Sequence, residues 1–292
     1  VVRGVLLVLL GLSLGTLRDM PILIIVSVYG LLVVLALPAR LLSTRSLVVL
    51  TAAWSVLAPI GLLALRIGRD PVPVDQPGWS DAREPWQLLG TLVLWGGYPA
   101  LVWMAYLLAG LVIGRLDLSD PVTGARLVGG GLVLTCGALA VARLDEPDWR
   151  ELFARDDYPF SSVGWSELWT TAPHSSMPLN VVGAVGSSAV VIGVCVLLVQ
   201  VAVLRRLLWP LAVAGAGTLT LYTVHALWTW RLRLDEPAPD EGGWGPWALQ
   251  AVVLVAAAVL WRLRFRRGPL EAVVRVLSVP RRARRGPDTT RA

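Results

Sequence analysis

Two histidines are the side chains best suited to move a proton near neutral pH in this chain of 292 residues. His225 lies within a long apolar run, and His174 lies shortly before the start of another. An ionisable side chain inside a membrane-spanning segment is costly to bury, so it indicates a function by default. We therefore take His174 and His225 as candidate catalytic residues. The alternative is that a histidine such as His225 only hydrogen-bonds a neighbouring helix and fixes its packing.

Arginine supplies all 26 of the lysine and arginine residues, because the sequence contains no lysine. A planar guanidinium binds phosphate through two parallel hydrogen bonds. We take Arg115, Arg205 and Arg206 as candidates for binding a phosphate-bearing ligand such as a coenzyme A. Further candidates lie near the C-terminus, at Arg262, Arg264, Arg266 and Arg267. The alternative needs no ligand, because arginines gather on the cytoplasmic side of membrane proteins in general.

Other chemistries have weaker support in the sequence. Several carboxylates could include a general base, although a solvated acidic loop is the better explanation for any one of them: Asp145, Glu146, Asp148, Asp156 and Asp157. No spacing typical of a metal site occurs, so we predict no metal ligands. A basic tail beside a membrane helix contacts anionic lipid, so we expect no nucleic-acid partner. Cys136 and Cys195 fall inside apolar runs, where we expect small core residues rather than a disulfide.

The elements that position these side chains are predicted to be membrane helices. The chain is 55% hydrophobic and 16% charged, whereas a soluble domain carries about a quarter charged residues. A helix needs roughly 20 apolar residues to cross a bilayer, so the apolar runs predict about eight transmembrane helices. These runs are 5–17, 22–38, 47–65, 88–114, 127–142, 179–204, 207–230 and 247–260. Gly96-Gly97-Tyr98-Pro99 interrupts the fourth run, so we expect a short piece at 88–95 and a span at 99–114.

The predicted fold is therefore an all-α, polytopic membrane helix bundle, embedded in the lipid bilayer of a bacterial plasma membrane. Arginines in short loops and in the tail place both termini in the cytoplasm. The three long loops at 66–87, 143–178 and 231–246, on the opposite side, hold 15 of the 20 carboxylates. We expect the bundle to cover 1–264, a short interfacial helix 265–280 and a disordered basic tail 281–292. Stripes of glycine at 129–131 and 183–186 predict close helix packing.

Several segments, taken in order along the chain, resemble one family. They are Tyr29-Gly30, Gly97-Tyr98-Pro99, Gly114-Arg115-Leu-Asp117, Pro173-His174-Ser175-Ser176, Leu219-Thr-Leu-Tyr222-Thr-Val-His225 and Gly268-Pro269-Leu270-Glu271. The set resembles the bacterial heparan-alpha-glucosaminide N-acetyltransferase-like transmembrane acyltransferases. It resembles equally the related YeiB-like membrane proteins, whose function is unassigned.

The resemblance implies transfer of an acyl group, such as acetyl, from cytoplasmic acyl-CoA to a sugar or amine acceptor on the outer side. It implies acyl-CoA as a co-substrate rather than a bound cofactor, with His174 and His225 lining the site. Tyr98, Trp103 and Tyr222 become candidates for binding the substrate. In that family an upstream helix carries an Asp-x-x-Arg-Gly-like motif and then a histidine. This chain shows neither, so we expect a fragment that lacks the first two helices and is incomplete as an enzyme.

Two other functions stay open at this point. A transporter or flippase could hold its substrate at the break at 96–99, since discontinuous helices mark such sites. Few charges lie deep in the predicted spans, which argues against an ion-coupled pump. The chain could also be a non-catalytic packing or assembly subunit, and the sequence is compatible with a homo-oligomer.

Overall fold

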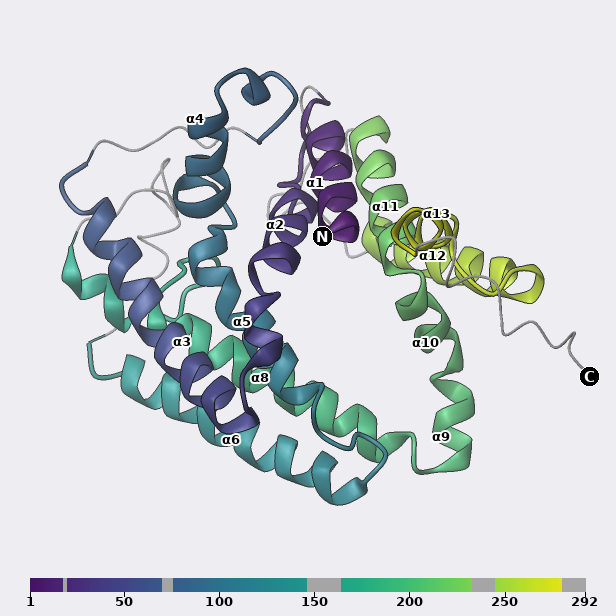
Figure 1. Cartoon of the computed structure of the whole chain (residues 1–292). Helices are drawn as coiled ribbons and strands as arrows, with labels where there is room; N and C mark the ends of the chain where they lie inside the picture. The colour runs from purple at the N-terminus through teal and green to yellow at the C-terminus, as the bar shows by residue number, and fades with distance from the viewer. Residues whose placement is uncertain (18–19, 70–75, 146–163, 233–244, 280–292) are drawn as a thin grey trace, which may run out of the picture.

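The computed structural model describes residues 1–17, 20–69, 76–145, 164–232 and 245–279, and helices make up its regular elements (Figure 1). The α-helices are α1 (Val2–Gly15), α2 (Val26–Leu35), α3 (Thr44–Arg66), α4 (Pro85–Gly90), α5 (Ala100–Ile113), α6 (Pro121–Ala142), α8 (Pro178–Leu198), α9 (Ala202–Leu207), α10 (Trp209–Ala216), α11 (Thr218–Leu232), α12 (Gly245–Arg264) and α13 (Pro269–Ser278). Shorter helical turns are η1 (Pro38–Leu41), η2 (Asp81–Arg83), η3 (Thr91–Trp95) and η4 (Trp165–Trp169). The all-α prediction is confirmed for the described residues.

Each of the eight predicted apolar runs forms helix, but the helices differ in length. Among the described residues, α3, α6, α8 and α12 are long and apolar enough to cross a membrane. Two bent helix pairs raise the number of candidate spans to six if each pair counts as one span. The first two runs form α1 and α2, which have 14 and 10 residues. The structure thus supports four to six candidate spans, and eight crossings remain a prediction.

The predicted break at 96–99 is confirmed. Helix α4 continues into the π-helical turn η3, and this pair meets α5 at 59°. The Gly96 N–H donates to the Thr91 carbonyl over 2.8 Å and closes the turn. Pro99 then caps α5, because its missing N–H needs no partner at a helix start.

A second break contradicts the prediction of one straight span over 207–230. The run is divided into α9, α10 and α11, and α10 meets α11 at 83°. Pro210 lies at the start of α10, and Gly217 leaves the helical region at its end with φ −113° and ψ 25°. The two residues explain the division, because proline and glycine both weaken a helix interior.

Glycines set the closest helix contact, between the antiparallel helices α6 and α8 (Figure 1). A methyl group on Gly131 would lie 2.5 Å from the Gly186 carbonyl oxygen, and one on Gly193 would lie 2.6 Å from that of Gly124. The helices therefore meet backbone to backbone, as the glycine stripes predicted.

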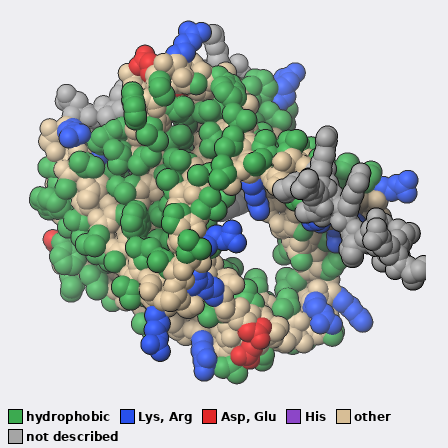
Figure 2. All heavy atoms as spheres, in the orientation of Figure 1, with side chains coloured by type: hydrophobic (Ala, Val, Ile, Leu, Met, Phe, Trp, Pro, Cys, Tyr) green, Lys and Arg blue, Asp and Glu red, His purple; other side chains and the backbone are tan. Residues whose placement is uncertain are grey.

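The buried core lies where α2, α3 and α5 meet. Leu32, Leu47 and Leu108, one from each helix, are almost fully buried. Apolar side chains also dominate the face shown in Figure 2, with basic side chains spread around its rim and around a hollow beside the arm formed by α9 and α10. A surface of this kind suits hydrocarbon rather than water. Cys136 and Cys195 are both exposed, so the expectation that they pack in the core is wrong.

The two ends of the described chain lie close together. Helix α13 packs against both α1 and α11 (Figure 1). It forms within the segment where a short interfacial helix is expected, and its place at a membrane surface remains a prediction. The predicted disordered tail at 281–292 lies outside the described residues.

Candidate functional site

A basic cavity of about 640 Å³ lies between the start of α1, the α10–α11 bend, the end of α12 and helix α13. Five arginines line it: Arg3, Arg262, Arg266, Arg267 and Arg275. Glu271 is the one carboxylate among the lining residues. Such an excess of guanidinium groups attracts anions and is well matched to phosphate.

Glu271 offsets one of the five positive charges, and its carboxylate is hydrogen-bonded to α11. The Thr220 N–H donates to Glu271 Oε1 over 3.0 Å, and the Thr220 hydroxyl donates to Oε2 over 2.5 Å. The Leu270 N–H in turn donates to the Thr220 hydroxyl oxygen over 3.1 Å. These contacts fasten the start of α13 to the start of α11, and the excess of arginines keeps the cavity positive.

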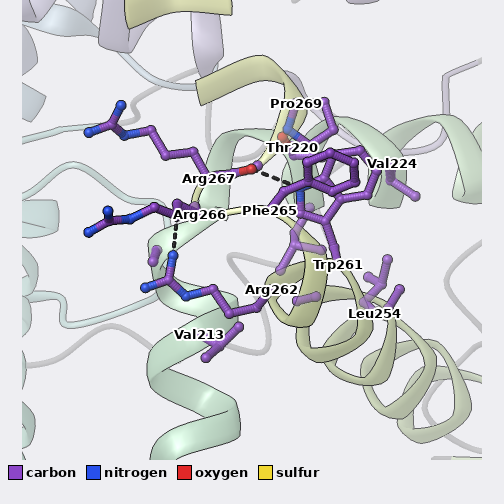
Figure 3. A pocket seen from close by; sticks show the side chains of 16 residues that line it. Val213, Thr220, Val224, Leu254, Trp261, Arg262, Phe265, Arg266, Arg267 and Pro269 are labelled. Atoms are coloured by element: carbon purple, nitrogen blue, oxygen red, sulfur yellow. Dashed lines mark hydrogen bonds between the residues drawn. The ribbon is translucent and has the colours of Figure 1, made fainter. Parts of the chain in front are cut away.

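Arg266 and Arg267 are held through their backbone carbonyls, which leaves these two guanidinium groups available. Trp261 Nε1 donates to the Arg267 carbonyl over 2.7 Å, and Arg262 Nη1 donates to the Arg266 carbonyl. The side chains of Arg266 and Arg267 make no hydrogen bond or ion pair within the described part of the chain. Figure 3 shows the Arg262, Arg266 and Arg267 side chains extending toward the same side.

An apolar slot of about 160 Å³ adjoins the basic cavity, and the two share Ala216, Arg262, Arg266 and Arg267 (Figure 3). Trp261 and Phe265 stack at 4.3 Å along the slot. The combined site thus offers positive charge and an adjoining apolar surface. It suits an amphiphile that carries phosphate.

A second group of residues gathers around Tyr98 at the broken helix. The Tyr98 ring lies 5.0 Å from that of Trp103 and 6.1 Å from that of His174. Tyr29 and Tyr106 extend this aromatic cluster through Trp103, at 6.3 and 5.0 Å. The structure therefore brings His174 together with Tyr98 and Trp103, which were predicted from a different segment.

Tyr222 joins the aromatic cluster from α11. It packs against the same core cluster as Tyr98 and Trp103, and its hydroxyl accepts a hydrogen bond from the Ile25 N–H over 3.3 Å. Tyr222 lies two residues after Thr220, which lines the apolar slot and binds Glu271. Helix α11 therefore connects the two groups of candidate residues directly.

The loop that carries His174 has an uncommon backbone. His174 and Ser176 adopt φ values of 62° and 59°, in the left-handed region that side chains other than glycine rarely occupy. Ser175 and Ser176 are buried, whereas His174 is exposed beside Tyr98. Strained backbone of this kind clusters at functional sites, and no local sequence signal predicted it here.

His225 lies in a different environment, between α11 and α12. Its Nδ1 is 2.9 Å from the Gln250 Oε1, and Gln250 Nε2 reaches the Thr229 hydroxyl at 3.5 Å. The Trp247 ring lies 6.1 Å away. Gln250 is thus the hydrogen-bond partner that the packing interpretation of His225 requires. The catalytic role of His225 remains a prediction.

The three arginines first predicted to bind coenzyme A lie outside the basic cavity. Arg115 donates to the carbonyl oxygens of Leu42 and Arg40, at 2.9 and 3.3 Å, and so fastens the segment before α3. Arg205 and Arg206 are exposed on α9. Their role toward a ligand remains a prediction.

Carboxylates from the predicted acidic loop contribute little to the described sites. Asp145 is exposed, while Glu146, Asp148, Asp156 and Asp157 lie outside the described residues. Within the described ranges, no group of three or more His, Cys, Asp or Glu residues could hold a metal ion.

Some polar residues of the structure were not singled out from sequence. Arg66 is buried at the end of α3, donates from Nη2 to the Leu94 carbonyl over 3.2 Å, and interacts electrostatically with the buried Glu167. Arg3 and Arg275 complete the basic cavity. A buried charge at a helix end gives no local signal, because its partner comes from a distant segment.

Comparison with known proteins supports part of the resemblance. Residues 160–281 match the family described as "Protein of unknown function (DUF418)", which comprises YeiB-like membrane proteins. The matched segment includes His174, Tyr222, His225 and four of the five cavity arginines. No curated protein and no solved structure matches the chain.

Proposed function

We propose that this membrane protein is an acyltransferase-like protein of the bacterial plasma membrane. It would pass an acyl group, such as acetyl, from cytoplasmic acyl-CoA to a glycan or small amine on the outer side. The basic cavity would bind the donor, and the aromatic cluster with His174 would bind the acceptor. Both termini would lie in the cytoplasm, which agrees with the packing of α13 against α1 beside the arginines.

One observation carries this proposal: α11 joins the basic cavity to the aromatic cluster within one helical turn. Thr218, Leu219 and Thr220 line the donor side, and Tyr222 packs against the same buried core as Tyr98 and Trp103 on the other. A donor and an acceptor held by the same helix would be kept in fixed relative positions, which is how enzymes lower the entropic part of a barrier.

The chemistry follows from the side chains present. The acceptor hydroxyl or amine attacks the thioester carbonyl, a carbon–oxygen or carbon–nitrogen bond forms, and the carbon–sulfur bond breaks. The coenzyme thiol leaves, and the acceptor's proton must be removed. His174, exposed beside Tyr98, would take this proton as general base. The arginines would bind the phosphates of the donor.

The direct test is binding of coenzyme A to the purified protein in detergent by titration calorimetry. We expect saturable binding that the double variant Arg266→Ala/Arg267→Ala weakens at least tenfold, because two charge-assisted contacts are lost. The matched control is Arg205→Ala/Arg206→Ala, which removes the same charge from exposed positions on α9. Dephospho-coenzyme A, which has one phosphate fewer, should bind more weakly than coenzyme A.

Each outcome of the titration is informative. Loss of binding in the Arg266/Arg267 variant alone supports the donor site in the basic cavity. An equal loss in both double variants would mean that total charge, rather than this cavity, attracts the ligand. Absence of saturable binding in the unaltered protein would overturn the acyl-CoA proposal.

A transporter or flippase is the second candidate, favoured by the two bent helix pairs. The pocket at the break near Gly96, Gly97 and Tyr98 is small, about 20 Å³, which is room for a water molecule rather than a substrate. Transport would therefore require this pocket to widen. Uptake or flipping of a labelled amphiphile in vesicles, without any acyl transfer, would favour this function over the first.

A further inference from the structure

An apolar groove of about 560 Å³ lies on the flank of the bundle, separate from the basic cavity. Residues of α3, α5, α6 and α8 line it, and small side chains such as Ala52, Gly130 and Ala189 make it wide. Its volume is within the range of about 300–1,000 Å³ typical of small-molecule sites. Because α3, α6 and α8 are candidate spans, we place the groove at the depth of the hydrocarbon.

The groove offers no free hydrogen-bonding group along its apolar part. Its two hydroxyls are bound within α3, since Thr51 donates to the Leu47 carbonyl over 2.7 Å and Ser55 to the Thr51 carbonyl over 2.8 Å. A polar ligand buried there would lose hydrogen bonds to water without replacing them. The groove therefore suits a hydrocarbon chain.

Arg126 is the one charged residue that lines the groove. Its guanidinium makes no hydrogen bond or ion pair with any residue that the structure describes. It lies five residues after Pro121, the first residue of α6, so it is about 7–8 Å along the helix. An arginine at this depth extends toward the membrane surface, where lipid phosphates lie.

We propose that this groove is a binding site for an anionic phospholipid of the surrounding leaflet. One acyl chain lies between α3 and α6, and the phosphate binds Arg126. The lipid gives the guanidinium the hydrogen bonds that the described protein residues do not provide. The inference does not depend on acyl transfer, because it uses none of the residues of the donor and acceptor sites.

The test is lipid retention by native mass spectrometry of the detergent-purified protein. Phosphatidylglycerol and phosphatidylcholine with identical acyl chains are titrated separately. We expect the unaltered protein to retain phosphatidylglycerol preferentially, and Arg126→Gln to reduce this retention about tenfold, toward that of phosphatidylcholine. Arg143→Gln, at the other end of α6, is the charge-matched control and should leave retention unchanged.

Two glycines of α6 give a second, independent pair of variants. A side chain at Gly130 would point into open space within the groove, so Gly130→Leu should fold and should displace the acyl chain of either lipid. Gly129→Leu also meets no neighbour but does not line the groove, so it should retain lipid normally.

The outcomes separate this site from its rivals. Normal phosphatidylglycerol retention in both Arg126→Gln and Gly130→Leu would overturn the proposal. A change of oligomeric mass in Gly130→Leu, with lipid retention unchanged, would overturn it in favour of a second copy of the chain covering the groove. The same titration on Arg266→Ala/Arg267→Ala measures any lipid bound at the basic cavity. This variant should lose that lipid and should keep the lipid bound in the groove.

Discussion

Removal of the Glu271 carboxylate should release α13 from α11. Glu271 accepts hydrogen bonds from both the N–H and the hydroxyl of Thr220. Hydrogen bonds to a charged group contribute about 1.5–3 kcal/mol each. Both residues are partly exposed, so solvent screening reduces the combined effect to about 2 kcal/mol. Glu271→Ala should therefore shift the docking equilibrium of α13 roughly 30-fold toward the released state.

Hydrogen exchange measures this shift directly. The Thr220 amide is bound to the carboxylate, and the Ala272 amide donates to the Gly268 carbonyl in the first turn of α13. Both amides should exchange roughly 30-fold faster in Glu271→Ala. Ser278→Ala is the control on the same helix, because the buried Ser278 hydroxyl has no hydrogen-bond partner among the described residues.

The reasoning is refuted if Thr220 and Ala272 keep their protection in Glu271→Ala. It is also refuted if Ser278→Ala accelerates their exchange to the same degree, since general loosening of α13 would then explain the result. Thr220→Val should give an intermediate acceleration, because it removes the hydroxyl bonds but keeps the backbone bond to Glu271.

Three further perturbations test the packing of the bundle. Gly186→Val should destabilise the protein by about 1–3 kcal/mol through overpacking against α6. Gly137→Val should not, because no neighbour lies within 4 Å of a side chain added there. Thermal melting in detergent compares the two variants. His225→Leu should lower the stability by about 1–3 kcal/mol in the same assay, because it leaves the buried Gln250 with an unpaired oxygen. The double variant His225→Leu/Gln250→Leu should recover part of this stability. Arg115→Ala should speed proteolysis of the segment at 40–44, because the Arg115 side chain fastens this segment. Weaker binding of coenzyme A to this variant would instead place Arg115 at the donor site.

Local signals in the sequence predicted the helices and one of the two breaks. Three of the four residues in Gly96-Gly97-Tyr98-Pro99 are glycine or proline, and the chain does bend there. The second bend at Gly217 was missed because a glycine between small residues is also common in unbroken membrane helices. The stripes at Gly131 and Gly186 were interpreted correctly because close packing leaves little choice of residue.

The candidate site could be predicted only in part, because much of it depends on long-range contacts. Tyr98 and Trp103 come from one segment and His174 from another, and the structure brings them together. Arg3 reaches the C-terminal arginines from the opposite end of the chain, which no spacing in the sequence indicates. His225 likewise finds Gln250 on a helix that follows a long connection.

Helix α12 should tolerate mutation unusually well. Only 6% of its most apolar stretch is buried, compared with 28% for α3 and for α8. Lipid tails are as apolar as leucine, so exchange of one aliphatic side chain for another on that surface changes little. Selection on α12 should act on its overall hydrophobicity more than on the identity of each residue, except at the buried Gln250 and at Trp261 and Arg262, which line the candidate site. A saturation library of this helix would then show broad acceptance of aliphatic residues and sharp restriction at Gln250, Trp261 and Arg262.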